Sequence, residues 1–141
     1  MQRRKAREAA LQALFQIDVG KAPANDAVAY AVMFNDLSGD TEEFCRSLVA
    51  GVIANQAGID ELIGRLAVDW SLDRLANVDR NVLRMALFEL MYRHDIPVGA
   101  TINEAVEIAK SFGNPDSGRF INGILGQFTR DGNPRQADNE R

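Results

Sequence analysis

The amino-acid sequence predicts an all-α protein with about seven helices. Over most of its 141 residues, apolar side chains recur at intervals of three and four, which is the spacing of one helix face. Glycine, proline and capping residues interrupt this pattern where helices are expected to end. No useful stretch alternates apolar and polar side chains as a half-buried strand would, and no internal repeat is evident. These observations favour a helical fold over a sheet-based one.

The first two predicted helices lie in the amino-terminal part of the chain. The first has an apolar side that includes Ala6, Ala10 and Leu14, and it ends at the helix breakers of residues 20–23. The second covers residues 26–36, where valine, alanine and phenylalanine mark the apolar positions.

Two further helices are predicted between residues 40 and 66. Asp40 and Glu43 have the spacing of a capping box, which places the start of the third helix there. Residues 55–58 indicate a break before the fourth helix, because they combine polar side chains with a glycine.

The stretch from residue 70 to residue 95 predicts the most apolar helix. From Val78 to Tyr92, apolar side chains cover nearly all directions around the axis, which is typical of a helix at the centre of a bundle. Pro97 stops this helix. Glu89 lies within the apolar sector, so we expect a buried, hydrogen-bonded acid that fixes helix packing.

Two more helices complete the predicted fold. Thr101 and Glu104 form a capping box for a helix over residues 102–112, which Gly113 closes. The last predicted helix covers residues 116–128.

Residues 131–141 have one alanine as their only apolar side chain, so we expect a disordered tail. Residues 1–130 are then expected to form a single all-helical domain, because a chain of this length suits one domain.

Positive charge is concentrated at the amino terminus of an otherwise acidic chain. Arg3, Arg4, Lys5 and Arg7 are the only charged residues among the first seven, whereas the whole chain has a net charge of −4. Each cation at the positive end of a helix dipole costs about 0.3 kcal/mol or more. A polyanionic partner such as phosphate is the simplest reason to keep these cations, and a solvated helix end without a partner is the alternative.

The sequence contains no recognisable catalytic or metal-binding set. His94 is the only histidine, Cys45 is the only cysteine, and no glycine-rich phosphate loop occurs. A lone thiol on an apolar helix face is usually a core residue. We therefore expect a protein that is not an enzyme and uses no metal or cofactor. Without a membrane-spanning apolar run or a signal peptide, we expect a cytoplasmic protein.

Aromatic and charged residues occur together in two places. Phe15 follows the arginine cluster, where it could stack on an unpaired base or be covered by a second helix. The segment Lys110–Phe120 combines cations, hydrogen-bonding side chains and two phenylalanines. Within it, Asp116 is either part of a site or a cap of the last helix. Phe112 is expected in the core, and Phe120 is either core or exposed.

Three parts of the chain resemble the NusB family of transcription antitermination factors, in the order in which that family has them. They are Arg3–Phe15, Trp70–Leu75 with Val78–Leu90, and Ile102–Gly113 with Arg119–Leu125. The resemblance runs from residue 3 to about residue 128, and its last part is the most distinctive.

This resemblance implies two small three-helix bundles that share a core. It also implies a non-catalytic protein that binds the boxA element of ribosomal RNA leader transcripts, a single-stranded RNA, together with the ribosomal small-subunit protein NusE. Other Nus factors and RNA polymerase join this complex, and termination is suppressed. Some members of the family form homodimers, so the resemblance allows a homodimer here.

The RNA contacts of the family match ten positions of this sequence: Arg3, Arg4, Lys5, Arg7, Phe15, Asp79, Arg84, Asp116, Arg119 and Phe120. Two of them depart from the family pattern. Phe15 stands where tyrosine is frequent, and Asp79 is shorter than the glutamate of some relatives.

Two other functions fit parts of the sequence. A similar domain forms the RNA-binding part of certain ribosomal-RNA cytosine methyltransferases, but we expect no catalysis because this chain ends before a βα unit for S-adenosylmethionine. The second alternative is a structural helical oligomer whose basic end is incidental. RNA binding and the oligomeric state distinguish these alternatives.

Overall fold

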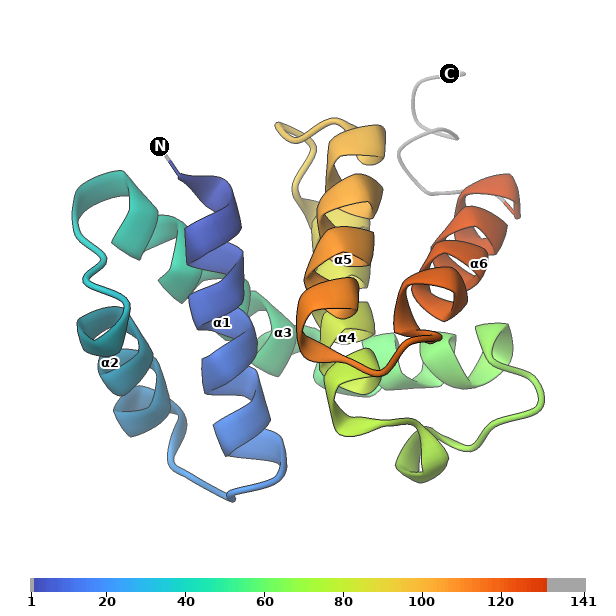
Figure 1. The fold of residues 1–141 in the computed structure, drawn as a ribbon, viewed down its shortest axis with the longest axis horizontal. Coiled ribbons are helices and arrows are strands. Elements are labelled where there is room, and N and C mark those ends of the chain that lie inside the picture. Colours follow the sequence, from blue (N-terminus) through green and yellow to red (C-terminus); the bar gives the residue numbers. More distant parts are fainter. Residues whose placement is uncertain (1, 132–141) are drawn as a thin grey trace. The chain divides into compact units, whose positions relative to one another are not determined.

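The structure, a computed structural model, describes residues 2–131, and the regular secondary structure in this part of the chain is entirely helical (Figure 1). The described residues form six α-helices and one short 3₁₀ helix, without a strand. The all-α prediction is therefore confirmed. The predicted tail, residues 131–141, lies outside the described residues except for Asp131.

The chain divides into two compact units, Met1–Ala54 and Asn55–Arg141. The first unit contains α1 (Arg3–Asp18), α2 (Ala24–Phe34) and the beginning of α3 (Gly39–Leu66). The second contains the rest of α3, followed by η1 (Leu72–Arg74), α4 (Asn77–Tyr92), α5 (Val98–Phe112) and α6 (Ser117–Arg130). A single domain over residues 1–130 stays a prediction.

Small side chains allow α1 and α2 to pack closely in the first unit. The fully buried alanines of α1 are Ala6, Ala9, Ala10 and Ala13. Since alanine adds little bulk, two helix axes can approach closely at such positions. Asn35, at the C-terminal end of α2, donates a hydrogen bond from Nδ2 to Oε1 of Gln12 on α1 (2.9 Å). The apolar side predicted for the first helix is thus its packed side.

One continuous helix, α3, replaces the two helices predicted between residues 40 and 66. The predicted break at residues 55–58 is wrong, because Gly58 costs a helix only about 1 kcal/mol and no proline occurs in this stretch. Residues 55–58 instead lie within the helix, directly after the boundary between the two units, which follows Ala54. The predicted cap is also wrong, because α3 begins at Gly39 and Asp40 lies inside the first turn, where an acid suits the helix dipole.

α4 is the buried central helix of the second unit. Every residue from Asp79 to Leu90 is buried, and α4 packs against both α5 and α6. This confirms the prediction of a central apolar helix, although its bounds are narrower than residues 70–95. Residues 72–74 form η1 instead, and α4 ends at Tyr92.

Glu89 is the buried, hydrogen-bonded acid that the sequence predicts. Its side chain belongs to α4 and is 1 % exposed, and its Oε1 accepts a hydrogen bond from the hydroxyl of Thr101 on α5 (3.2 Å). The predicted capping box is wrong, because α5 begins at Val98 and Thr101 lies inside its first turn. The Thr101 hydroxyl is used to join two helices, and such a buried polar pair fixes how they pack.

The connection between α5 and α6 requires a glycine. A Cβ added to Gly113 would collide with Oγ of Ser117 and would lie 2.8 Å from the carbonyl oxygen of Ala109. α6 begins directly after this tight connection, one residue later than predicted. Phe112 is 52 % exposed, so its predicted place in the core is wrong. The buried side of α5 ends with Ala109, which leaves the last turn of the helix open to solvent.

Cys45 is a core residue of the first unit, which confirms the prediction for a lone thiol. Its side chain is fully buried, and this burial raises the pKa of the thiol to about 11. A thiol that is protonated at neutral pH and closed to solvent is unreactive. Cys45 therefore contributes packing.

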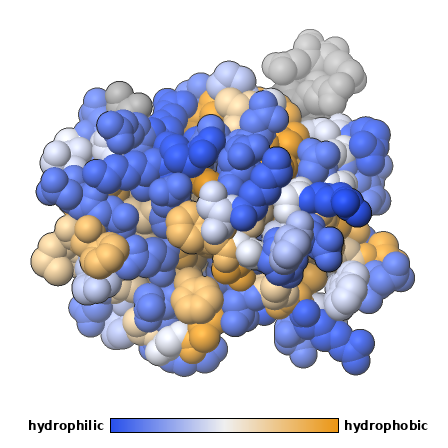
Figure 2. Space-filling model, in the orientation of Figure 1, coloured by the Kyte–Doolittle hydropathy of each residue, from blue (hydrophilic) through white to orange (hydrophobic). Residues whose placement is uncertain are grey.

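Hydrophilic side chains cover most of the face drawn in Figure 2, and apolar side chains reach the surface in a few places, among them over α2. Tyr30, Met33 and Phe34 of α2 are 51 %, 71 % and 66 % exposed. The rings of Tyr30 and Phe34 stack with their centroids 5.8 Å apart, so each ring shields part of the other from water.

Candidate nucleic-acid interface

The cations of the amino-terminal cluster differ in their exposure. Arg4 is exposed and Arg3 and Lys5 are half-buried, whereas Arg7 is only 3 % exposed. The first turn of α1 contains no acid, and the N-cap residue Gln2 makes no capping hydrogen bond with its side chain. The start of α1 therefore combines the positive end of the helix dipole with three accessible or partly accessible cations.

The aromatic ring of Phe44 on α3 contacts two of these arginines. The guanidinium carbons of Arg3 and Arg7 each lie 5.3 Å from the centroid of the Phe44 ring. Contacts of this kind between a cation and an aromatic face are attractive. Because Arg7 is buried, its contact with Phe44 serves the packing of α1 on α3. The role of Phe44 could not be found from the sequence, where this residue belongs to the apolar side of a helix.

Phe15, the aromatic residue of α1 that we singled out, is half-buried. Part of its ring is packed and part is accessible, so the structure favours neither of the two alternatives over the other.

The second unit contains an open pocket of about 370 Å³, which is within the size range of small-ligand sites. Its wall comes from three separate segments: the connection between α3 and α4, the start of α4, and the connection from α5 into α6. The lining residues are Trp70, Arg74, Leu75, Ala76, Asp79, Asn114, Pro115, Asp116 and Phe120. The pocket thus brings together three of the predicted site residues, namely Asp79, Asp116 and Phe120.

Asp79 is the chemically distinctive group of this pocket. It is 6 % exposed, and its Oδ1 atom is buried without a hydrogen-bond partner among the described residues. A buried acceptor without a partner is unfavourable by about 1–3 kcal/mol. A ligand that donates an N–H group to this oxygen would remove that cost.

The rim of the pocket at the start of α6 carries charges of both signs. Asp116 is exposed and occupies the N-cap position, but its side chain makes no capping hydrogen bond. The turn is closed instead by Oδ1 of Asn114, which accepts a hydrogen bond from the Asp116 backbone N–H (2.8 Å), and by Oγ of Ser117. Arg119 is also exposed, and Phe120 is half-buried at the pocket wall.

Trp70 and Arg74 of the pocket wall were not among the predicted site residues. Trp70 is 52 % exposed, which is unusual for the only tryptophan of a small protein. Asp73 lies in the same connecting segment, and its pKa is lowered by a hydrogen bond from the Ser71 side chain and by its own backbone N–H. The signal available in the sequence was an aromatic residue and a cation close together in the segment before the apolar helix, because binding residues are often placed on connecting segments.

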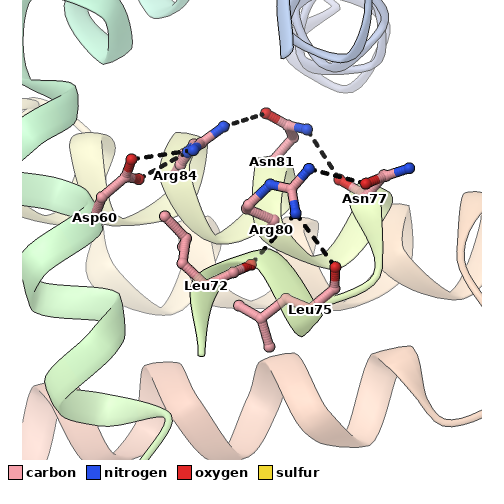
Figure 3. A network of polar contacts seen from close by, with 7 residues as sticks. All are labelled: Asp60, Leu72, Leu75, Asn77, Arg80, Asn81 and Arg84. Carbon is pink, nitrogen blue, oxygen red and sulfur yellow. Dashed lines mark hydrogen bonds and ion pairs between the residues drawn. The ribbon is translucent and has the colours of Figure 1, made fainter. Parts of the chain in front are cut away.

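Arg84, another predicted site residue, is bound inside the second unit (Figure 3). Its Nε and Nη2 atoms donate to the two carboxylate oxygens of Asp60 on α3, at 2.8 and 3.0 Å. Its Nη1 atom donates to Oδ1 of Asn81 at 3.3 Å. The residue is 5 % exposed, so this geometry gives Arg84 a place in the packing of α4 on α3.

No group of histidine, cysteine, aspartate or glutamate side chains in residues 2–131 is arranged to hold a metal ion. In the same part of the chain, none of the helices has the length and apolar character needed to cross a membrane.

The fold and the candidate site together define a small all-helical protein with cations at the start of one helix and an aromatic, partly acidic pocket. The NusB family model matches residues 4–130, so the chain belongs to the NusB family. A transcription antitermination protein NusB from Heliobacterium modesticaldum is 49 % identical over 131 residues, and the alignment covers 93 % of this chain and 64 % of that protein.

Two solved structures resemble the fold closely. NusB from T. maritima is 38 % identical and has a TM-score of 0.89, with 96 % of each chain covered. A structure of the antitermination factors NusB and NusE in complex with double-stranded RNA has a TM-score of 0.85 and 25 % identity, and covers 94 % of this chain and 100 % of that chain.

Proposed function

We propose that this protein is a cytoplasmic, non-catalytic transcription antitermination factor that binds RNA together with the ribosomal protein NusE. Its RNA is a single-stranded segment of the boxA type from ribosomal RNA leaders. Membership of the NusB family, whose curated members include transcription antitermination proteins, supports this proposal. The related structure of NusB and NusE in complex with double-stranded RNA supports NusE and RNA as partners, whereas the single-stranded form of the RNA is inferred from the pocket described next.

The observation that carries the proposal is the pocket of the second unit, with Phe120 and Trp70 beside the unpartnered oxygen of Asp79. Aromatic rings stack on unpaired bases of any kind. An acceptor atom such as Oδ1 of Asp79 pairs with a base edge that presents an N–H group. A duplex hides these edges, because side chains cannot read the deep major groove of A-form RNA. The pocket is therefore suited to an unpaired base.

The phosphate chain is expected to contact the cations that solvent reaches fully or in part. These are the exposed Arg4 and Arg119, and the half-buried Arg3 and Lys5. Arg7 and Arg84 are 3 % and 5 % exposed, and they contact Phe44 and Asp60, so we assign them to the support of α1 and α4. Phe15 is kept as a candidate for base stacking.

Partner proteins complete the proposed activity. NusE is expected to complete the RNA site, so its addition should raise the affinity for RNA. Other Nus factors and RNA polymerase would join through this complex, and a homodimer of the free protein stays a prediction.

A fluorescence titration tests the proposed function directly, because Trp70 is the only tryptophan and lines the pocket. Single-stranded boxA-type RNA should quench Trp70 emission, and the midpoint should move to lower RNA concentration when NusE is present. The matched control is the same RNA annealed to its complement, which should compete weakly. No change in emission with either RNA, with and without NusE, would refute the proposal.

Replacement of Asp116 by asparagine should strengthen RNA binding by about three- to tenfold at low salt. The exposed carboxylate lines the pocket, three residues before the proposed phosphate contact Arg119, and asparagine removes its repulsion of phosphate while keeping its shape. Filter binding at several salt concentrations measures the effect, which should shrink as salt increases. Asp131→Asn, at an exposed aspartate outside the pocket, is the control. Equal or weaker binding by Asp116→Asn would contradict the expectation.

A further inference from the structure

Arg80 makes an unusual set of contacts in the first turns of α4. Its Nη1 atom donates to the backbone carbonyl oxygens of Leu72 and Leu75, both at 3.3 Å, and its Nη2 atom donates to Oδ1 of Asn77 at 2.8 Å (Figure 3). The residue is 8 % exposed, so these contacts are made largely out of water. Hydrogen bonds donated by a charged group are stronger than those between neutral groups.

Both carbonyl groups belong to the segment that joins α3 to α4, and one of the two residues, Leu75, lines the pocket. The segment that joins α3 to α4 contributes Trp70, Arg74, Leu75 and Ala76 to the lining. This segment contains a single 3₁₀ turn, so its shape depends on contacts with its surroundings rather than on regular secondary structure. Arg80 supplies such contacts from the rigid helix α4 on which Asp79, the neighbouring pocket residue, is also placed.

We infer that Arg80 is a positioning residue for the RNA-binding pocket. Its guanidinium holds the segment from Trp70 to Ala76 against α4, so that Trp70 faces the same pocket as Asp79 and Phe120 before RNA arrives. This inference rests on the proposed function of the pocket. A wall that is already in place spares the cost of ordering it when the ligand binds.

Arginine is required for this role because of its geometry. A guanidinium presents donors in a fixed plane and can reach two carbonyl groups and an amide together, whereas the ammonium of lysine is a compact point charge. Arg80→Lys therefore keeps the charge and removes the geometry. Since the residue contacts no phosphate in this proposal, the salt dependence of RNA binding should not change.

The experiment compares Trp70 emission, acrylamide quenching and RNA affinity in Arg80→Lys and the parent protein. In Arg80→Lys we expect red-shifted emission, easier quenching and about tenfold weaker binding of boxA-type RNA, comparable to the loss of one base contact, with an unchanged salt slope. Asn77→Ala removes one anchor of the guanidinium without burying a new charge, and it should shift Trp70 in the same direction by a smaller amount. This second variant decides the question if Arg80→Lys does not fold.

Two substitutions serve as controls on the same helix. Arg93→Lys changes a guanidinium that binds Asp95 at the other end of α4, and it should leave both Trp70 and RNA affinity unchanged. Arg84→Lys weakens a buried bond to α3, so it should lower the melting temperature while Trp70 emission stays in place.

Unchanged Trp70 signals in both Arg80→Lys and Asn77→Ala would overturn the inference, as would shifted emission with undiminished RNA affinity. An equal Trp70 shift in Arg84→Lys would also overturn it, because general loosening of α4 would then explain the result. If the parent protein itself bound no RNA, the proposed function would fail, and the pocket could not be called an RNA site whatever Arg80 does.

Discussion

Arg84→Met should lower the free energy of unfolding by about 3 kcal/mol, the largest stability effect that we expect from a single substitution. The guanidinium makes two hydrogen bonds to the Asp60 carboxylate, and the two side chains are 6 % and 20 % exposed. Methionine fills a similar volume but leaves the carboxylate of Asp60 without its cation. Chemical denaturation followed by circular dichroism measures the change.

The exposed pair of Arg46 and Glu42 provides the matched control. It has the same 2.8 Å distance between nitrogen and oxygen, but its side chains are 45 % and 35 % exposed. Arg46→Met should therefore change the free energy of unfolding by less than about 1 kcal/mol. The double variant Asp60→Leu with Arg84→Met should recover part of the loss, because no buried charge then lacks a partner. Similar losses in Arg84→Met and Arg46→Met would contradict this account.

Local patterns predicted which segments are helical, because apolar spacing and helix breakers act within a few residues. α1, α2 and the buried helix α4 follow directly from such patterns. The same signals could not show that α3 is continuous. A glycine and two polar residues are compatible with both a loop and an exposed helix, and packing on either side decides between them. Thr101 was misplaced for a similar reason, since its hydroxyl binds Glu89 of another helix.

The candidate site depended even more on contacts between distant residues. The sequence grouped Arg3, Arg4, Lys5 and Arg7 by charge, but only the structure separates Arg7, which lies against Phe44. Arg84 was placed among the RNA contacts by family resemblance, and its partner Asp60 is 24 residues away in the sequence. The exposed aromatic Trp70 joins the pocket because Arg80 holds its segment. Charge and residue type identify candidates, whereas burial decides which candidates can meet a ligand.

Combined replacement of Arg3, Arg4 and Lys5 by glutamine should produce the largest loss of RNA binding. Three fewer phosphate contacts should reduce the slope of log affinity against log salt by about 2 and weaken binding on the order of 100-fold at low salt. Arg7 stays in place because it is buried against Phe44 and supports α1. Filter binding or anisotropy at four or more salt concentrations measures both quantities.

The control for this triple variant removes the same charge from three exposed cations outside the proposed interface: Lys21, Arg46 and Arg65. Since the net charge changes equally, long-range repulsion is the same in both variants. Only loss of direct contacts can then flatten the salt slope in one variant alone. If both variants show the same slope, the amino-terminal cations act through the overall field, and α1 does not hold the phosphate chain.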